Sequence, residues 1–514
     1  MGDRVHKSLL NAKVNLIFYF LSLFFAFFSR DIFLQCLGAE FIGLTGTLGN
    51  ILGYLNLAEL GVGGAISFFL FKPIQSHDRE KINEIISVFG YLYRRIGQFI
   101  LLAGILLSCF FPFIFSKENI GLGIIYFAFY SFLGSSLIGY FINYRQILLT
   151  ADQKNYVVAV YFQSAGLIKT ALQIFLAYNY RNLYVWVAIE FVFGIIGCVV
   201  LNWKINKEYP WVKTNVQSGN LLLKKYPEIL KNTKQIFIHK IKDFLLTRSD
   251  EIMIYAFVSL KMVAYYGNYT MIISKLAQLF TTTLDSVRAG VGNLVAEGNI
   301  ENIMKVFWEL MVVRYFIAGF MVFSLYFLIE PFISLWIGTQ YLLERIILIL
   351  LMINLYIMQS RGVVDMFNHA YGLYADTWSA WVELLLNVGI TIGIGIKYGI
   401  VGLLLGKIVS TFVIVVLWKP FYLFSKGFHL PIFSYWKGVM RYNFIFIISF
   451  GVVYLLILYF SLSPEETIWG FIKYGFYLVT MYLIINIPLF YYIGYGTKDF
   501  IKRWNMLGKI FRLK

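Results

Sequence analysis

Charged side chains interrupt the long apolar runs of this sequence. The stretch 25–44, FAFFSRDIFLQCLGAEFIGL, carries Arg30 and Asp31 side by side, and Glu59 follows in the next apolar run. Adjacent helical positions point about 100° apart, so Arg30 and Asp31 cannot both be satisfied by each other. A charge at the middle of a membrane span costs about 2.5–3.5 kcal/mol, so such residues normally face a bundle interior or water. We therefore expect Arg30 to line a polar cavity.

Further charged side chains stand in apolar runs along the rest of the chain. Guanidinium groups match phosphate oxygens with two parallel hydrogen bonds, so Arg and Lys in one cavity suggest an anionic substrate such as a phosphate. Pairing is the alternative for Asp285 with Arg288 and for Arg361 with Asp365, which have the spacing of ion pairs on one helix face. The candidate substrate-binding cations are Arg30, Arg248, Arg288, Arg314, Arg361 and Lys407. The candidates for orienting these cations or carrying a coupling proton are Asp31, Glu59 and Asp250.

The composition is that of a membrane protein. Of 514 residues, 59% are hydrophobic and 14% are charged, and the mean hydropathy is +0.72. An ordinary soluble domain carries about 25% charged residues, which excludes that class. Apolar runs of about 18 residues or more recur along the chain, whereas membrane-spanning β-strands would alternate over about ten residues. The sequence therefore predicts an all-α polytopic membrane protein.

We expect about fourteen membrane-spanning helices. With the N-terminus in the cytoplasm, the inside segments hold about two dozen Lys and Arg and the outside loops about five, as the positive-inside rule requires. Both termini are therefore expected in the cytoplasm, and this asymmetry accounts for most of the net charge of +17. The basic C-terminal tail is expected to lie on the membrane surface rather than to bind nucleic acid. The expected spans are 14–37, 42–71, 85–113, 120–149, 156–178, 183–203, 235–258, 262–294, 303–333, 343–368, 376–396, 399–424, 439–460 and 468–494.

Two stretches of the chain resemble each other. FSRD, ELGVGG and REKINEIISVF follow one another in the first half, and TRSD, RAGVGN and NIENIMKVF do so in the second. Shared membrane composition is the alternative explanation. A true repeat pairs the first six spans with the next six in one orientation, which places two like lobes around a central cavity, as in transporters. The expected division is an N-terminal lobe at 1–204, a basic cytoplasmic linker at 205–234, a C-terminal lobe at 235–424, and two added spans with a basic tail at 425–514.

No pattern of catalytic or metal-binding residues accompanies these spans. The three cysteines and five histidines are scattered, without metal-ligand or redox spacing. The GVG of each half follows no expected strand and lacks a following Lys-Ser/Thr, which argues against a nucleotide-binding loop. No expected outside loop is large enough for a catalytic domain. We therefore expect a protein that is not an enzyme and holds no metal or cofactor, while coupling to a proton or sodium gradient stays open.

The first 75 residues resemble the opening of a known transporter family. The residues that carry this resemblance are the Arg-Asp late in the first span, LGAEFIGL at 37–44, and LAELGVGGA at 57–65 before a Lys-Pro. They are similar to the Wzx-type polysaccharide flippases, which belong to the multidrug/oligosaccharidyl-lipid/polysaccharide exporter superfamily. YYGNYTMIISKLAQL and GVGNLVAEGN extend the likeness into the second half.

The likeness also bears on particular residues. The related lipid II flippases have a similar Arg-Asp and Ala-Glu, which places Arg30, Asp31 and Glu59 on candidate functional positions. Where those flippases carry further basic residues in the second span, this chain has Gly53 and Tyr54. The departure argues against lipid II itself as the substrate.

The resemblance implies a multi-pass protein of the bacterial cytoplasmic (inner) membrane. Such a protein moves an undecaprenyl-diphosphate-linked oligosaccharide repeat unit from the cytoplasmic to the outer face by alternating access. Its partners would be that lipid-linked substrate, membrane lipids and polysaccharide polymerase machinery, with no nucleic acid. Two alternatives fit the sequence less well: an ion-coupled antiporter for drugs or small cations would favour an acidic cavity, and a membrane polymerase or ligase would need a sizeable outer loop.

Overall fold

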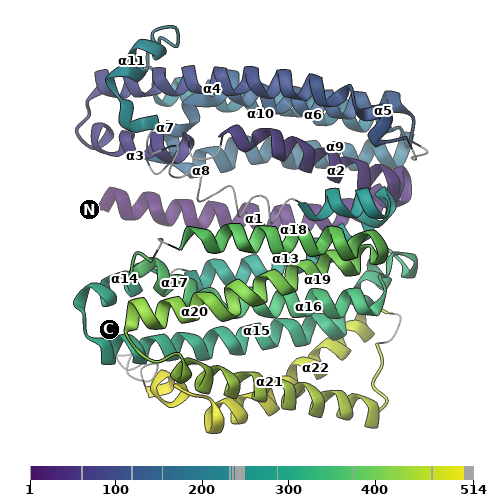
Figure 1. Ribbon diagram of the computed structural model, residues 1–514. Coiled ribbons are helices and arrows are strands. Elements are labelled where there is room, and N and C mark those ends of the chain that lie inside the picture. The colour runs from purple at the N-terminus through teal and green to yellow at the C-terminus, as the bar shows by residue number, and fades with distance from the viewer. Residues whose placement is uncertain are drawn as a thin grey trace. The chain divides into compact units, whose positions relative to one another are not determined.

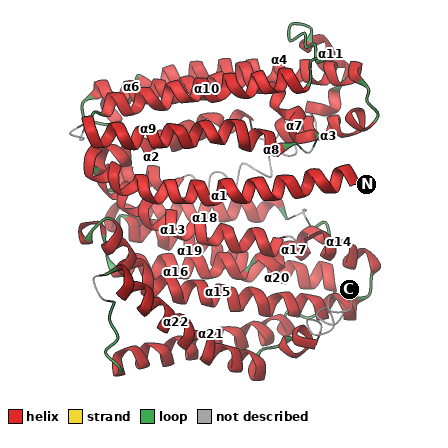
Figure 2. Ribbon diagram, turned by 180° about the vertical axis from the view of Figure 1, so that it is seen from behind, coloured by secondary structure: helices red, strands yellow, loops and turns green. Residues whose placement is uncertain are grey.

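The structure is a computed structural model that describes residues 2–59, 62–116, 120–152, 154–230, 233, 237, 249–285, 288–373, 376–464 and 467–502. Every regular element in these residues is a helix (Figures 1 and 2). Among them, eleven helical segments are long and apolar enough to cross a membrane, which confirms the predicted fold class. Each of the eleven overlaps an expected span. They are Lys13–Leu37, Arg79–Ser108, Leu122–Ala151, Tyr156–Tyr180, Leu183–Glu208, Ile300–Trp336, Arg345–Ala370, Trp378–Tyr398, Ile400–Phe428, Phe433–Tyr459 and Ile468–Ile493.

The remaining three expected spans take other forms. The second is divided into α2 (Ala39–Leu55) and α3 (Val62–Gln75), with a 3-10 turn, η1 (Asn56–Glu59), directly after α2. The eighth corresponds to α13 (Leu260–Asp285), a 26-residue helix that carries Lys261 and Lys275. The seventh, expected at 235–258, lies largely outside the described residues, of which 249–257 are helical. The count of fourteen spans stays a prediction.

Contacts between residues divide the chain into two compact units, Met1–Ala264 and Tyr265–Lys514, called unit 1 and unit 2 below. The boundary falls within α13, and the domain limits expected from the sequence stay predictions. Besides α2, η1 and α3, unit 1 contains α1 (Gly2–Leu37), α4 (Arg79–Ser108), α5 (Phe111–Ile114), α6 (Leu122–Ile142), η2 (Asn143–Gln146), α7 (Ile147–Ala151), α8 (Asn155–Val158), the π-helical η3 (Ala159–Gln163), α9 (Ser164–Tyr180), α10 (Leu183–Glu208) and α11 (Gly219–Lys225).

Unit 2 is built in the same way from long helices. It contains α14 (Arg288–Glu297), α15 (Ile300–Trp336), η4 (Thr339–Tyr341), α16 (Arg345–Ser360), α17 (Gly362–Ala370), α18 (Thr377–Tyr398), α19 (Ile400–Thr411), η5 (Phe412–Trp418), α20 (Lys419–Tyr422), η6 (Leu423–Phe428), α21 (Phe433–Tyr459) and α22 (Ile468–Ile493). Phe307, Phe367, Phe424 and Tyr442 are fully buried in its core.

Short polar side chains start several of the long helices. The Asp78 Oδ1 atom accepts a hydrogen bond from the Lys81 backbone N–H at 3.0 Å before α4. Before α10, the Asn182 Oδ1 atom accepts from the Tyr184 backbone N–H at 2.9 Å. Before α15, the Asn299 Oδ1 atom accepts from the Asn302 backbone N–H at 3.1 Å. Each such cap contributes about 1 kcal/mol by satisfying a backbone donor that lacks a partner within the helix. The sequence itself therefore fixes where these helices begin.

The segment between α10 and α11 packs along α4. The Asn83 Oδ1 atom accepts from the Lys213 backbone N–H at 3.1 Å, and the Ser87 hydroxyl accepts from the Asn215 backbone N–H at 2.9 Å. Lys225 then forms an ion pair with Glu84 at 2.8 Å. The described part of the expected basic linker is therefore anchored to unit 1.

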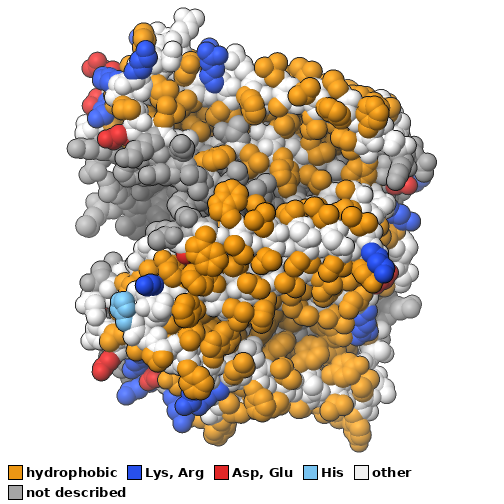
Figure 3. Space-filling model, in the orientation of Figure 1, with side chains coloured by type: hydrophobic (Ala, Val, Ile, Leu, Met, Phe, Trp, Pro, Cys, Tyr) orange, Lys and Arg blue, Asp and Glu red, His pale blue; other side chains and the backbone are white. Residues whose placement is uncertain are grey.

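Large apolar side chains cover the long helices on the outside. Leu102 is 68% exposed, Phe113 79% and Ile447 68%. In the view of Figure 3, hydrophobic side chains spread over the helix faces, while most charged side chains lie near the helix ends. Apolar patches of this extent are rare on soluble monomers and fit contact with lipid.

Candidate functional site

Arg30 connects α1 to the start of α13. Its Nη2 atom donates a hydrogen bond to the backbone carbonyl oxygen of Ala264 at 3.0 Å. The neighbouring Asp31 instead accepts a hydrogen bond from the Gln35 side chain, one turn along α1, at 2.6 Å. The two adjacent charges therefore contact different elements, as expected from their angular separation on the helix.

Glycines in α2 let residues 251–260, which precede and begin α13, approach α2 closely. A Cβ atom at Gly43 would lie 1.9 Å from the carbonyl oxygen of Leu260, the first residue of α13. A Cβ at Gly46 would lie 2.9 Å from Glu251 Oε2. That oxygen accepts a hydrogen bond from the Asn50 side chain at 2.6 Å. Small residues thus bring α2 into direct contact with residues 251–260, as they do between membrane helices in general.

Glu59 is held by two tyrosines on different helices. Its carboxylate accepts hydrogen bonds from the hydroxyls of Tyr93 on α4 and Tyr140 on α6, the latter at 2.6 Å. Both tyrosines are buried, and their ring centroids are 5.2 Å apart. Because hydrogen bonds to a charged group are stronger than neutral ones, the pair fixes this carboxylate at the break between α2 and α3.

Of the remaining candidates, the structure describes Asp250 but not the side chains of Arg248 and Arg288. Asp250 lies next to Glu251, and both Asp250 and Ser249 lie near the Tyr54 hydroxyl on α2. Arg248 falls outside the described residues. Arg288 is the first residue of α14, and its side chain falls outside them as well, so the expected Asp285–Arg288 pair stays a prediction.

In unit 2, two of the candidate arginines lie together. Arg361 and Asp365 form an ion pair at 3.1 Å, which confirms the pairing alternative for these residues. Gly362, which follows Arg361 in the chain, packs against the Arg314 guanidinium, because a Cβ atom at Gly362 would lie 2.6 Å from Arg314 Cζ. Arg314 is only 3% exposed. Lys407 lies in α19 and is partly buried.

Two further charges expected within membrane spans pair with each other. Lys169 on α9 and Glu190 on α10 form an ion pair at 2.5 Å. The Gln173 side chain donates to the same carboxylate at 3.0 Å. This arrangement satisfies both charges within unit 1.

The sequence did not reveal the partners of these charges. Asn50, Tyr93 and Tyr140 were not among the candidates, because an isolated polar residue in an apolar helix has no sequence signal of its own. Within the described residues, no group of three or more His, Cys, Asp or Glu side chains could hold a metal ion. Each unit therefore holds arginines and carboxylates inside apolar helices: Arg30, Glu59 and Glu251 in unit 1, and Arg314, Arg361 and Asp365 in unit 2.

No protein-family model and no curated protein match the chain, but solved structures do. A lipid II flippase, MurJ, in an inward closed conformation is 17% identical, with 92% of this chain and 99% of that chain covered, at a TM-score of 0.64. An inward-facing multidrug resistance transporter of the MATE family and MOP superfamily is 16% identical, at a TM-score of 0.57. The match covers 79% of this chain and 94% of that chain. The chain therefore has the fold of these membrane transporters.

Proposed function

We propose that this protein is a flippase for an undecaprenyl-diphosphate-linked oligosaccharide repeat unit. It would move this lipid from the cytoplasmic to the outer face of the bacterial inner membrane, with both of its termini in the cytoplasm. Alternating access of two lobes around a cationic cavity would provide the path. The fold supports this proposal, because one of the similar structures is that of a lipid II flippase.

The observation that carries the proposal is the placement of arginines within apolar helices. Arg30, Arg314 and Arg361 all lie inside segments that are long and apolar enough to cross a membrane. A guanidinium within a membrane span is energetically costly unless it binds a ligand or is paired with another polar group. A diphosphate is a chemically matched partner, since its oxygens accept paired hydrogen bonds from guanidinium groups.

The candidate residues then take two roles. Arg30 and Arg248 would contact the diphosphate first, supported by Arg288, Arg314, Arg361 and Lys407. Asp31, Glu59 and Asp250 would orient these cations or carry a coupling proton. The pair of tyrosine hydroxyls on Glu59 is consistent with either role, because both keep the carboxylate in a fixed position.

Export of drugs or small cations by ion-coupled antiport is the second candidate. The resemblance to a multidrug transporter structure favours it, and Glu59 supplies a carboxylate of the kind that such a mechanism needs. The excess of arginines counts against it, because cations in the cavity would repel a cationic substrate. Export of an intact cationic drug from vesicles that hold the protein, without lipid translocation, would favour this second function.

Arg30 offers the direct test. Arg30→Ala and Arg30→Lys are compared in cells for lipid-linked oligosaccharide on the outer face, with the membrane abundance of each variant measured in parallel. We expect Ala to abolish translocation at normal abundance and Lys to retain part of it, because Lys keeps the charge without the bidentate geometry. Lys224→Ala, which removes an exposed positive charge of α11 outside the candidate membrane spans, serves as the control and should leave translocation unchanged. Full translocation by Arg30→Ala at normal abundance would contradict the proposal.

A further inference from the structure

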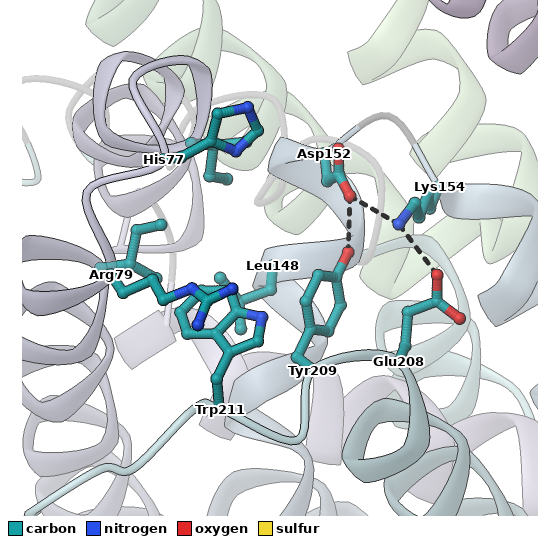
Figure 4. Close-up of a pocket in the computed structure, with 10 residues that line it drawn as sticks. His77, Arg79, Leu148, Asp152, Lys154, Glu208, Tyr209 and Trp211 are labelled. Atoms are coloured by element: carbon teal, nitrogen blue, oxygen red, sulfur yellow. Dashed lines mark hydrogen bonds and ion pairs between the residues drawn. The ribbon is translucent and has the colours of Figure 1, made fainter.

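A cavity of about 320 Å³ lies in unit 1 at the beginning of α4 and the end of α10 (Figure 4). Its polar lining consists of His77, Arg79, Asp152, Lys154, Glu208 and Tyr209, and Trp211 and three aliphatic side chains form the rest of the wall. The volume is at the lower end of the range of about 300–1,000 Å³ that small-molecule sites occupy. None of these residues belongs to the proposed translocation site.

One side of the cavity is a connected network of charges. The Lys154 ammonium lies 2.9 Å from both Asp152 Oδ2 and Glu208 Oε1, and the Tyr209 hydroxyl donates to Asp152 Oδ2 at 2.9 Å. Burial by itself would lower the pKa of Lys154, but its hydrogen bonds with Asp152 and Glu208 outweigh this and raise it. Burial and the charge of Asp152 raise the pKa of Tyr209. This side is therefore fixed in place and presents carboxylate oxygens.

The opposite side presents nitrogen donors. The Arg79 guanidinium lies over the Trp211 ring, 5.3 Å from its centroid. Within the described part of the chain, neither Arg79 nor His77 forms an ion pair through its side chain. His77 takes a left-handed backbone conformation, with φ of 54°, in the turn before α4. Figure 4 shows His77 and Arg79 across the cavity from Asp152 and Lys154.

The cavity lies where three candidate membrane spans end. Arg79 begins one span, Ala151 ends the next, and Glu208 ends a third. The boundary between such spans and water is the level at which lipid phosphates lie. Basic and aromatic residues at this level are the usual means of contacting anionic lipid head groups.

We propose that this cavity binds a phosphate ester that carries hydroxyl groups. The phosphate contacts Arg79 and His77, and the hydroxyls donate to the carboxylates of Asp152 and Glu208. A hydroxyl suits these carboxylates better than an ammonium group, because Lys154 already places a positive charge between them. The same chemistry is offered by the head group of phosphatidylglycerol and by soluble glycerol 3-phosphate.

Binding to the full-length chain tests this proposal without any translocation. The protein is placed in nanodiscs of phosphatidylcholine alone, or with added phosphatidylglycerol or phosphatidylethanolamine, and glycerol 3-phosphate is titrated into the first. Bound lipid is counted by native mass spectrometry, and soluble ligand by thermal stabilisation. We expect phosphatidylglycerol, glycerol 3-phosphate or both to bind, and phosphatidylethanolamine to bind much less.

Two substitutions on α4 separate the cavity from general surface charge. Arg79→Gln should weaken binding of the phosphate ester on the order of tenfold or more, the usual effect of losing a charge-assisted hydrogen bond. Lys81→Gln makes the same change of charge at an exposed residue of the same turn that does not line the cavity, and should change binding less than about twofold. His77→Asn, which tolerates the left-handed conformation, provides a second variant if Arg79→Gln does not fold.

The outcomes divide clearly. Binding of phosphatidylglycerol alone identifies a lipid as the source of the phosphate, and binding of glycerol 3-phosphate alone identifies a soluble metabolite. Equal losses in Arg79→Gln and Lys81→Gln would overturn the proposal, because they would indicate diffuse attraction to the whole surface. Absence of binding by both probes, or equal binding of phosphatidylethanolamine, would overturn it as well.

Discussion

Gly43 and Gly49 of α2 form a matched pair for testing how the candidate site is assembled. A Cβ at Gly43 would meet the Leu260 backbone, at 1.9 Å from the carbonyl oxygen and 2.7 Å from the carbonyl carbon, whereas a Cβ at Gly49 would meet nothing within 4 Å. Both positions lie in the interior of one helix. Gly43→Ala and Gly49→Ala therefore make the same chemical change in different surroundings.

The magnitudes follow from these distances. Ordinary van der Waals contact begins at 3.4 Å, so Gly43→Ala must separate α2 from Leu260 by about 1.5 Å, and overpacking of this kind costs about 1–3 kcal/mol. A shift of that size also weakens the hydrogen bonds of Arg30 with Ala264 and of Asn50 with Glu251, each worth about 1.5–3 kcal/mol because one partner is charged. The higher helix propensity of Ala returns about 0.8–1.0 kcal/mol. We expect a net destabilisation of about 2–4 kcal/mol.

Gly49→Ala should instead stabilise the protein by up to about 1 kcal/mol, because only the helix propensity changes. The free energy of unfolding of both variants is measured in the same detergent micelles, and translocation is measured in cells at matched abundance. Gly43→Ala should also reduce translocation, since it displaces the backbone carbonyl that Arg30 binds. Equal changes in stability for the two variants would refute the close approach of α2 and α13.

Three further predictions concern the hydrogen bonds and ion pairs of unit 1. Tyr140→Phe should cost about 1.5–3 kcal/mol of stability and much less in a Glu59→Gln background, which a double-mutant cycle would show, since its hydroxyl donates to that carboxylate. Lys154→Met should cost about 1.5–3 kcal/mol, because Asp152 loses its cation while Glu208 keeps its ion pair with Lys204 at 3.2 Å. Lys225→Met, with the lysine side chain 59% exposed, should cost less than about 1 kcal/mol; equal losses in thermal unfolding would refute this difference. The pKa of Lys154 is raised in the folded protein, so its contribution to the free energy of unfolding is fully present below the ordinary pKa of 10.5 and is lost as pH rises through the folded pKa. Unfolding curves of Lys154→Met should therefore lack this loss of stability at alkaline pH.

The sequence allowed the fold class to be predicted because apolar length is a strong signal. The spans around Arg314 and Arg361 were placed correctly from hydropathy alone. The division of the second span into α2 and α3 was not foreseen, because residues 42–71 carry one charged residue, Glu59, in an otherwise long and mostly apolar run, and the break depends on how the backbone packs. The N-terminal extent of α4 also exceeded the expectation: the helix is capped by Asp78 and begins at Arg79, six residues before the expected span 85–113.

The candidate site was predictable only in part. The spacing of Arg361 and Asp365 revealed their ion pair because both residues lie on one helix. The partners of Arg30 and Glu59 come from helices far away in the sequence, and only packing brings them together. The glycines of α2 illustrate the same limit, because nothing in the sequence identifies Leu260 as the neighbour of Gly43.

Translocation by the purified protein tests the central claim most directly. The protein is reconstituted in liposomes that contain an undecaprenyl-diphosphate-linked oligosaccharide, and the lipid that reaches the opposite leaflet is measured with a membrane-impermeant sugar-binding probe. We expect translocation to depend on the protein and to fall strongly in Arg30→Ala but not in Lys224→Ala. No translocation of this lipid by folded protein under any imposed ion gradient, together with uptake of a cationic drug by the same liposomes, would contradict the account.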